Sequence, residues 1–310
     1  MTITALINRK REIWSYFMSL TCLAISFVLI LLGDTVKKAV LDGLSFSINA
    51  IIPTLFPFFI LSDLWADVFS IPNNSIASKF FQKVFYLNGE SLTAFILGLI
   101  CGFPVGVKAA AELYKDKKLS KDELSHICGF SNNPSLAFVI SGVGAGILGS
   151  INTGVKLYLS VVISAIIVGI IFRRKNTISH NTNVISKQTF DLVESIKNAA
   201  LSSLNVAAYI VFFSALTGLI SVITNSIGVT TIFSALFEVG NAVNSISKLS
   251  NIDTNIRLSL IGFALGFSGF SVHLQAFSFL PREVSRTKYL FMKLIQGIIC
   301  AALILLISVI

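Results

Sequence analysis

The stretch "CGFPVGVKAAAELYKDKK" (101–118) interrupts what would otherwise be a membrane helix. The run before it, "SLTAFILGLI" (91–100), is apolar enough for the interior of a bilayer. Gly102, Pro104 and Gly106 then follow well before the roughly 20 residues that a spanning helix needs, and such residues weaken or remove helical hydrogen bonds. Because backbone groups in lipid must find partners within the protein, the sequence predicts a broken helix that is buried or faces a wet cavity.

The composition of the chain indicates a membrane protein. Of its 310 residues, 54% are hydrophobic and 13% charged, and the mean hydropathy is +0.83, whereas soluble domains carry about 25% charged residues. Continuous apolar runs favour an all-α integral membrane protein over a transmembrane barrel. The net charge of +9 is typical of basic cytoplasmic loops, so we expect a lipid bilayer and no nucleic acid as partner. The four cysteines lack C-x-x-C spacing, so no metal site, disulfide framework or cofactor is predicted.

A polar linker divides the chain into two parts. The linker spans 173–197 and separates an N-terminal membrane half, 1–172, from a C-terminal half, 198–310. The first apolar run is long enough to span and is followed by no small-x-small cleavage site, which predicts a retained helix with a cytoplasmic start. The predicted apolar segments are 14–33, 51–70, 91–107, 126–148, 151–172, 198–224, 229–246, 257–280 and 289–310.

The distribution of positive charge favours two re-entrant segments. If every apolar segment spans the membrane, the basic clusters 108–121 and 173–197 fall outside, against the positive-inside rule. If 91–107 and 229–246 instead dip in from opposite faces and return, 19 of the 24 lysines and arginines lie inside. The halves then become inverted copies with re-entrant or broken helices, an arrangement typical of secondary transporters.

The breaks of the first half carry groups that suit a small polar ligand. The helix that resumes at Lys108 presents free N–H groups and a positive dipole end, which suit an anion; a kinked helix with Lys108 reaching the surface is the alternative. In "FSNNPSLAF", Ser131, Asn132 and Asn133 precede Pro134, which is predicted to start a new helix. Intramembrane amides are costly unless hydrogen-bonded, so they are candidate ligand contacts, with a helix cap in a loop as the alternative.

The second half supplies two further sets of polar residues. Glu238 and Asn241 lie in "TTIFSALFEVGNAVNSI", where an intramembrane acid is a candidate proton or cation site; a surface hairpin would leave the acid merely solvated. In "GFSGFSVHLQ", His273 is a candidate proton shuttle or a hydrogen-bond partner of a neighbouring helix. The same stretch adds the candidate substrate contacts Ser268, Gly269, Ser271 and Gln275.

Signatures of catalysis are weak. "GAGILG" (144–149) matches G-x-G-x-x-G but lacks the strand and βαβ setting of a dinucleotide site. Ser268 and His273 are five residues apart on one helix, so they do not face each other as a catalytic pair would. We therefore expect no enzymatic activity.

The order of these motifs also gives a family resemblance. "IIPTLFPFFILSDL", "CGFPVGVK", "GFSNNPSLAFVISGVG", "FEVGNAV" and "GFSGFSVHLQ" together resemble the YlbJ family of sporulation integral membrane proteins, within the nucleoside-recognition or Gate superfamily. The likeness covers most of the chain beyond the first helix. It implies a multi-pass carrier that moves dipicolinate across the mother-cell-derived outer forespore membrane. The positions that match the family's motifs are Gly102, Pro104, Gly106, Lys108, Asn132, Asn133, Glu238, Asn241, Ser268, Gly269, His273 and Gln275.

Three hypotheses about function follow. The first is a carrier for a small carboxylate or similar polar metabolite, with dipicolinate implied by the resemblance and a nucleoside-like solute as the alternative. The second is a scaffold of a sporulation membrane complex that transports nothing, and the third, a membrane enzyme, ranks lowest. The coupling ion, the direction of transport and the partner, whether a second copy or a sporulation membrane protein, are left open by the sequence.

Overall fold

The described part of the chain is helical throughout its regular structure. The computed structural model describes residues 3–68, 71, 75–174, 191–224 and 226–309. Within these ranges there are helices and connecting turns but no strand, which confirms the all-α class predicted from composition. Most of the predicted linker, 175–190, lies outside the described residues, as do the side chains of the basic N-terminal cluster 9–11.

The helices of the first half are short wherever glycine or proline interrupts the apolar sequence. They are α1 (Ile3–Leu31), α2 (Gly33–Phe46), the π-helical turn η1 (Ser47–Ile51), α3 (Ile52–Val68), α4 (Ile76–Phe85), α5 (Ser91–Ile100), α6 (Val105–Lys115), α7 (Lys121–Ser131), the π-helical segment η2 (Phe138–Ile147) and α8 (Ile151–Ile171). Those of the second half are α9 (Leu192–Thr224), α10 (Ile227–Phe237), α11 (Val239–Ser247), α12 (Thr254–Phe267), α13 (Gly269–Phe279) and α14 (Arg286–Val309).

The same order of broken elements occurs in both halves. In the first, the pair α5–α6 is followed by the interrupted helix α7–η2 and then by the long helix α8. In the second, the pair α10–α11 is followed by the interrupted helix α12–α13 and then by α14. The helices stop at 101–104, 132–135, 238 and 268, within the four motifs singled out from the sequence. The inverted symmetry of the two halves stays a prediction.

Four described helices are long and apolar enough to cross a membrane, fewer than the predicted apolar segments. They are α8, α9, α12 continued into α13, and α14, and a fifth span exists if the pair 15–28 and 33–49, bent by 94°, is counted as one. The segments 91–107 and 126–148 instead contain the shorter apolar helices α5 and η2. These helices are short because glycine, proline and asparagine interrupt them, and such residues weaken helical hydrogen bonds, remove them or compete for them.

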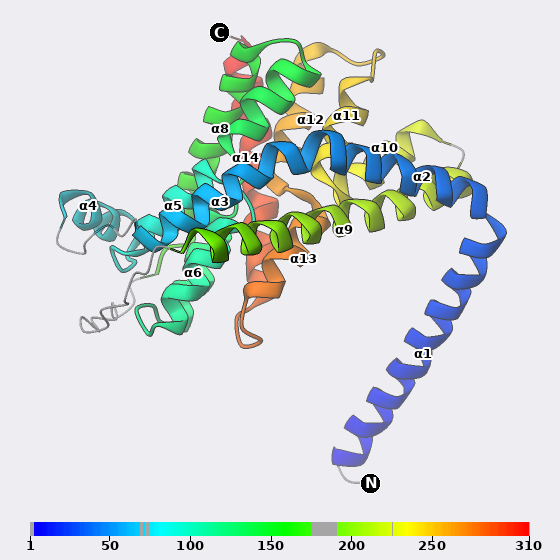
Figure 1. Ribbon diagram of the computed structural model, residues 1–310, viewed down its shortest axis with the longest axis horizontal. Helices are drawn as coiled ribbons and strands as arrows, with labels where there is room; N and C mark the ends of the chain where they lie inside the picture. The colour runs from blue at the N-terminus through cyan, green and yellow to red at the C-terminus, as the bar shows by residue number, and fades with distance from the viewer. Residues whose placement is uncertain (1–2, 69–70, 72–74, 175–190, 225, 310) are drawn as a thin grey trace.

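Two layers of helices cross each other. Figure 1 shows α9 running beside α2 and α3 in the opposite direction, while α8, α12 and α14 stand across them as a packed group. The 33 residues of α9 measure about 50 Å, which exceeds the ~30 Å hydrocarbon core of a bilayer. A helix of this length spans only if it is strongly tilted, in agreement with its crossing of the upright group.

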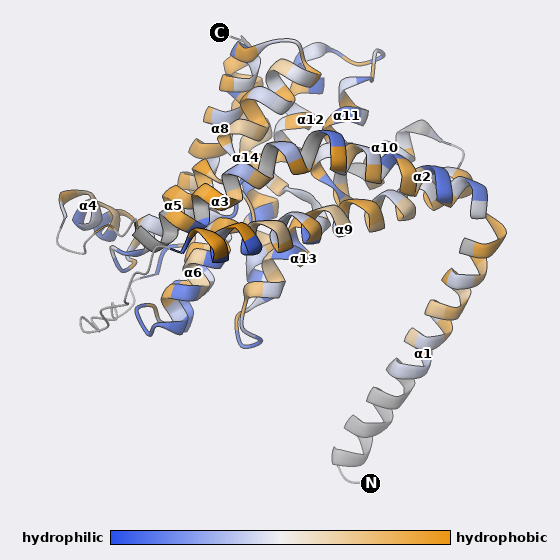
Figure 2. Ribbon diagram, in the orientation of Figure 1, coloured by the Kyte–Doolittle hydropathy of each residue, from blue (hydrophilic) through white to orange (hydrophobic). Residues whose placement is uncertain are grey.

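The polar loops gather at the ends of the upright helices. The loops that follow α6 and α13 lie at one end of this group, and the loop between α11 and α12 lies at the other (Figure 1); Figure 2 colours the first two predominantly hydrophilic. The positive-inside count placed Lys293 among the cytoplasmic cations, and the structure contradicts this. Lys293 lies inside α14 and is fully buried, so it belongs to the interior rather than to a loop.

Local capping fixes where the broken helices begin. Ser120 and Glu123 form a capping box at the start of α7, and the Glu123 carboxylate also accepts the backbone N–H of Asn88 at 2.9 Å. At the second break, Ser135 Oγ accepts the backbone N–H of Phe138 at 3.1 Å. The helix therefore resumes after Ser135, and the prediction that Pro134 occupies its first turn was wrong, because the serine side chain supplies the cap.

Candidate functional site

In each half, the break of the paired helices packs directly on the break of the interrupted helix. Gly102 has φ of +86°, and a Cβ placed on it would lie 2.7 Å from the backbone nitrogen of Ser135. Gly269 has φ of +78°, and a Cβ placed on it would lie 3.1 Å from the carbonyl oxygen of Phe237 and 3.2 Å from the nitrogen of Glu238. Only glycine accommodates both the left-handed backbone and this close approach.

A central cavity brings breaks from both halves to one place. Its space measures about 30 Å³, which is enough for water and too small for an aromatic solute. The first half contributes its two breaks, and the second half contributes Glu238 and one face of α13. The lining residues are Cys101, Gly102, Phe103, Ser135, Phe138, Val206, Ile210, Glu238, Val239, Ser271, Val272 and Gln275.

Two predicted contacts, Ser271 and Gln275, lie on consecutive turns of α13 and line this cavity. Gln275 is 4% exposed, and its Oε1 has no hydrogen-bond partner. A buried amide without a partner costs free energy, and the assignment of its oxygen and nitrogen is interchangeable. The side chain is therefore ready to donate to, or accept from, a molecule that enters the cavity.

Glu238 is both a wall of the cavity and the cap of α11. Its carboxylate accepts the backbone N–H groups of Gly240 at 2.9 Å and Asn241 at 2.5 Å, and the residue is 5% exposed. The surface-hairpin alternative is therefore wrong. The carboxylate is held by the N-terminal end of a helix, where negative charge is favoured. By contrast, α6 begins after Pro104 without any side-chain cap.

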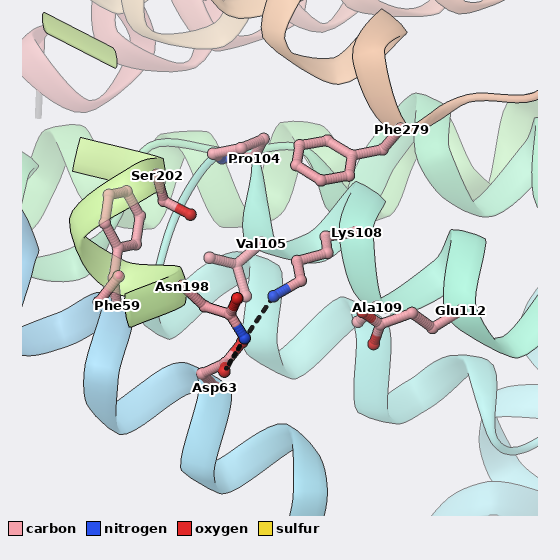
Figure 3. Close-up of a pocket in the computed structure, with 11 residues that line it drawn as sticks. Phe59, Asp63, Pro104, Val105, Lys108, Ala109, Glu112, Asn198, Ser202 and Phe279 are labelled. Atoms are coloured by element: carbon pink, nitrogen blue, oxygen red, sulfur yellow. Dashed lines mark hydrogen bonds and ion pairs between the residues drawn. The ribbon is translucent and has the colours of Figure 1, made fainter. Parts of the chain in front are cut away.

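Lys108 does not reach the central cavity. Its ammonium forms an ion pair with Asp63 at 2.5 Å, and Asn198 Nδ2 donates to the other Asp63 oxygen at 3.0 Å. Figure 3 shows the three side chains converging from α6, α3 and α9, with Pro104 and Phe279 beside them. Neither predicted alternative, the anion-binding lysine nor the surface-reaching lysine, describes this arrangement. We call the space that they line the Asp63 crevice; it also includes Phe59, Val105, Ala109, Glu112, Ala199 and Ser202.

The two asparagines of the second break are fully buried and bonded to α14, not to the central cavity. Asn132 Nδ2 donates to the Tyr289 hydroxyl at 2.6 Å, and Gln296 Nε2 donates to Asn133 Oδ1 at 2.7 Å. Lys293 Nζ donates at 2.7 Å both to the main-chain oxygen of Asn132 and to Gln296 Oε1. Asn132 is also the C-cap of α7 and Asn133 Nδ2 donates to Phe130 O at 2.7 Å, so the asparagines do end a helix, in the protein interior.

Sequence reasoning missed the α14 side of this network. Tyr289, Lys293 and Gln296 recur every three or four residues, so they share one face of the helix. A lysine and a glutamine within an apolar run of this kind are signals of a functional or structural polar site, and this signal was available in the sequence. In the described chain no carboxylate lies within ion-pair distance of Lys293, which makes this fully buried lysine unusual.

The remaining predicted residues lie near the central cavity or near the polar network on α14. His273 Nδ1 lies 3.3 Å from the Tyr289 hydroxyl, so the residue joins the α14 network as the helix-bonding alternative predicts. Gly106 packs against the carbonyl oxygen of Ser131, and Ser268 Oγ donates to Leu265 O at 3.1 Å, so these residues shape the breaks.

Asn241 lies on the far side of Glu238 from the central cavity and borders a wider groove. Its Nδ2 donates to Ser214 Oγ at 3.2 Å. The groove measures about 600 Å³ and lies between α2, α9, α10 and α11. We call it the α9 groove; it is lined by Thr35, Lys38, Ala39, Asp42, Gly43, Phe46, Ser214, Thr217, Gly218, Ser221, Thr230, Asn241, Asn244 and Ser245.

No group of three or more histidine, cysteine, aspartate or glutamate side chains suited to a metal ion occurs among the described residues. The polar groups around the central cavity are amides, hydroxyls and one capped carboxylate. Such groups are able to form hydrogen bonds with a polar molecule in the cavity.

Comparison with known proteins supports the predicted resemblance. The chain is similar to the sporulation integral membrane protein YlbJ of Bacillus subtilis (strain 168), with 25% identity over 337 aligned positions that cover 92% of this chain and 82% of that protein. The YlbJ-like character is thus confirmed, and the spans make the chain a multi-pass membrane protein. Membership of the wider nucleoside-recognition superfamily stays a prediction. No family model and no solved structure matches the chain.

Proposed function

We propose that this protein is a carrier for a small carboxylate-bearing solute, with dipicolinate as the first candidate and the central cavity as its binding site. One observation carries the proposal. Backbone breaks from both halves and the unpartnered amide of Gln275 meet at one cavity. Irregular backbone at membrane depth is tolerated where it lines a cavity, and sites at the interface of two halves with broken helices are typical of secondary transporters.

The choice of a carboxylate rests on the start of α6. This helix lacks a side-chain cap; Gly102 and Phe103, which precede it, line the central cavity, and Pro104 and Val105, where it begins, line the adjacent Asp63 crevice. An uncapped helix start has backbone N–H groups and the positive end of the dipole available for a carboxylate, and the Gln275 amide adds a donor in the central cavity next to it. The similarity to a sporulation membrane protein makes dipicolinate, a dianionic ring, the reasonable first probe.

A second candidate class is a neutral polar ring such as a nucleoside. No lysine, arginine or histidine lines the central cavity, because Lys108 is paired with Asp63 and His273 with Tyr289. A ring read by amide and hydroxyl groups alone would suit this lining, with the buried Glu238 as a further acceptor. The uptake experiment therefore includes both solutes.

The test is uptake of radiolabelled dipicolinate, with uridine in parallel, into proteoliposomes that contain the full chain. Gln275→Leu removes the unpartnered amide from the cavity, and Gln82→Leu makes the same change on α4, away from every cavity described above. We expect saturable dipicolinate uptake that Gln275→Leu reduces at least tenfold and Gln82→Leu leaves unchanged. Both variants are checked for unaltered elution and thermal unfolding in detergent.

Each other outcome has a distinct meaning. Saturable uridine uptake without dipicolinate uptake would select the neutral-ring class. Absence of uptake of either solute by folded protein would contradict a self-sufficient carrier and favour the scaffold hypothesis. Equal loss in the two glutamine variants would contradict the central cavity as the site.

A further inference from the structure

One face of α9 lines all three of the cavities described above. The residues on this face recur at intervals of three or four, which places them on one side of a helix. From the first to the last, the stripe extends about 35 Å along the helix axis at 1.5 Å per residue. In order they are Asn198 and Ser202 at the Asp63 crevice, Val206 and Ile210 at the central cavity, and Ser214, Thr217 and Ser221 at the α9 groove.

The partitions between neighbouring cavities are thin. Phe103 lines the central cavity and the adjacent Pro104 lines the Asp63 crevice. On α13, Gln275 faces the central cavity and Phe279, one turn further on, faces the crevice. The central cavity and the Asp63 crevice are therefore separated only by these side chains and by the backbone between Phe103 and Pro104.

On the other side, hydrogen bonds form the partition. Glu238 lines the central cavity and accepts the backbone N–H of Asn241, which lines the groove. Asn241 Nδ2 in turn donates to Ser214 Oγ on α9. The chain Glu238–Asn241–Ser214 thus closes the central cavity toward the groove with two hydrogen bonds, each of modest net strength.

The opposite face of α9 is exposed and, apart from Asn205, apolar over the middle of the helix. Leu204 is 62% exposed and Phe212 is 54% exposed, as expected for side chains that contact lipid. Asn198, Ser202, Ser214, Thr217 and Ser221 line the cavities instead, and Gln275, whose Oε1 is buried without a partner, lines the central one. In a membrane, such a polar face borders either another helix or water, and here it borders cavities.

We propose that the solute path of this protein runs along this face of α9, from the α9 groove through the central cavity to the Asp63 crevice. This proposal rests on the carrier function proposed above. The α9 groove, at about 600 Å³, is the water-filled vestibule that admits a small hydrogen-bonding solute. The Glu238–Asn241–Ser214 chain closes one end of the central site, and the Lys108–Asp63–Asn198 cluster, with Pro104 and Phe279, closes the other.

The test is the reaction of introduced cysteines with a membrane-impermeant, thiol-specific reagent in proteoliposomes. Thr217→Cys and Ser221→Cys probe the vestibule, Val206→Cys probes the central site, and Leu204→Cys and Phe212→Cys probe the lipid-facing side of the same helix. The unsubstituted chain, labelled in parallel, corrects for its own cysteines, three of which are buried. Thiols react as thiolates, which form in water and not in lipid.

We expect the vestibule cysteines to react at least tenfold faster than the two lipid-facing cysteines. A saturating transported solute should slow the reaction at Val206→Cys at least threefold. Equal rates on the two faces of α9, or a solute that changes no rate along the path face, would overturn the proposal. The rates without solute do not depend on transport, so failure of the path and failure of the carrier function are distinguished.

Discussion

The ammonium of Lys293 lies 2.7 Å from the main-chain oxygen of Asn132, so the last long helix is bonded to the backbone of a helix break 161 residues earlier. Asn132 is the residue that ends α7, and a cation at the C-terminal end of a helix is favourable. The bond fixes the second break against α14. It does so with a fully buried lysine for which the described chain supplies no carboxylate.

The first prediction concerns the free energy that this buried charge costs. Burying an ammonium without a counter-charge costs several kcal/mol, which offsets the about 1–3 kcal/mol lost for each acceptor left without a donor. We expect Lys293→Met to keep or raise the stability of the folded protein. Because the second break would lose the bond that fixes it against α14, solute uptake should fall at least tenfold. Denaturant titration in detergent and proteoliposome uptake measure the two effects. A fall in stability above about 3 kcal/mol would identify Lys293 as a purely structural residue.

A second prediction concerns the glutamine beside it. Gln296→Leu removes an acceptor from Lys293 and the donor to Asn133. Because a charged group and an amide oxygen both lose a buried partner, we expect a loss of about 2–4 kcal/mol in unfolding free energy. Leu294→Ala, on the exposed side of the same helix, serves as the control and should change little. Comparable losses in the two variants would contradict a specific network.

The third prediction compares two glycines with similar backbone conformation. Gly102 (φ +86°) would place a new Cβ 2.7 Å from Ser135, whereas Gly149 (φ +66°) has nothing within 4 Å of that position. Gly149→Ala therefore measures backbone strain alone, and Gly102→Ala adds crowding of about 1–3 kcal/mol. Thermal unfolding of the two variants in detergent tests the difference. If they unfold at the same temperature, the breaks at Gly102 and Ser135 are not packed as described.

The fourth prediction concerns the ion pair of the Asp63 crevice. Lys108 and Asp63 are partly exposed, at 29% and 16% of their side-chain areas, so each single neutralisation should cost no more than about 1 kcal/mol of stability. Uptake should respond more strongly, because the pair closes one end of the proposed path. Asp63→Lys combined with Lys108→Asp should recover part of the uptake that each single charge reversal loses. Recovery of uptake in this double variant would show that the ion pair itself is required. No recovery would show that each residue is needed for another reason.

A fifth prediction tests the cap of α11. Glu238→Ala leaves two backbone N–H groups without their acceptor and should cost about 1–2 kcal/mol of unfolding free energy. Asp253→Ala removes the cap of α12 at an exposed position and should cost a similar or smaller amount. Only the Glu238 variant should also alter uptake, since only Glu238 lines the central cavity. Denaturant titration and uptake assays on both variants check this, and altered uptake in Asp253→Ala would contradict it.

The sequence by itself determined the class of the protein and the positions of its breaks. The chain has too few charged residues for the surface of a soluble protein. In lipid, each backbone N–H and C=O group must be paired within the protein. Glycine, proline and asparagine therefore mark where helices stop, and the helices do stop at 101–104, 132–135, 238 and 268. Ser271 and Gln275 were predicted as polar residues of the stretch 266–275, and both line the central cavity.

Only the tertiary structure decided which side chains meet. Lys108 was predicted at an anion site, yet it pairs with Asp63, 45 residues away. The asparagines were predicted to contact a ligand, yet α14 holds them through Lys293 and Gln296. Helical periodicity specifies the face on which a residue lies but not the helix that this face packs against. That choice depends on how all the helices pack together, and it settles which polar groups are bonded and which, like Gln275, are left facing a cavity.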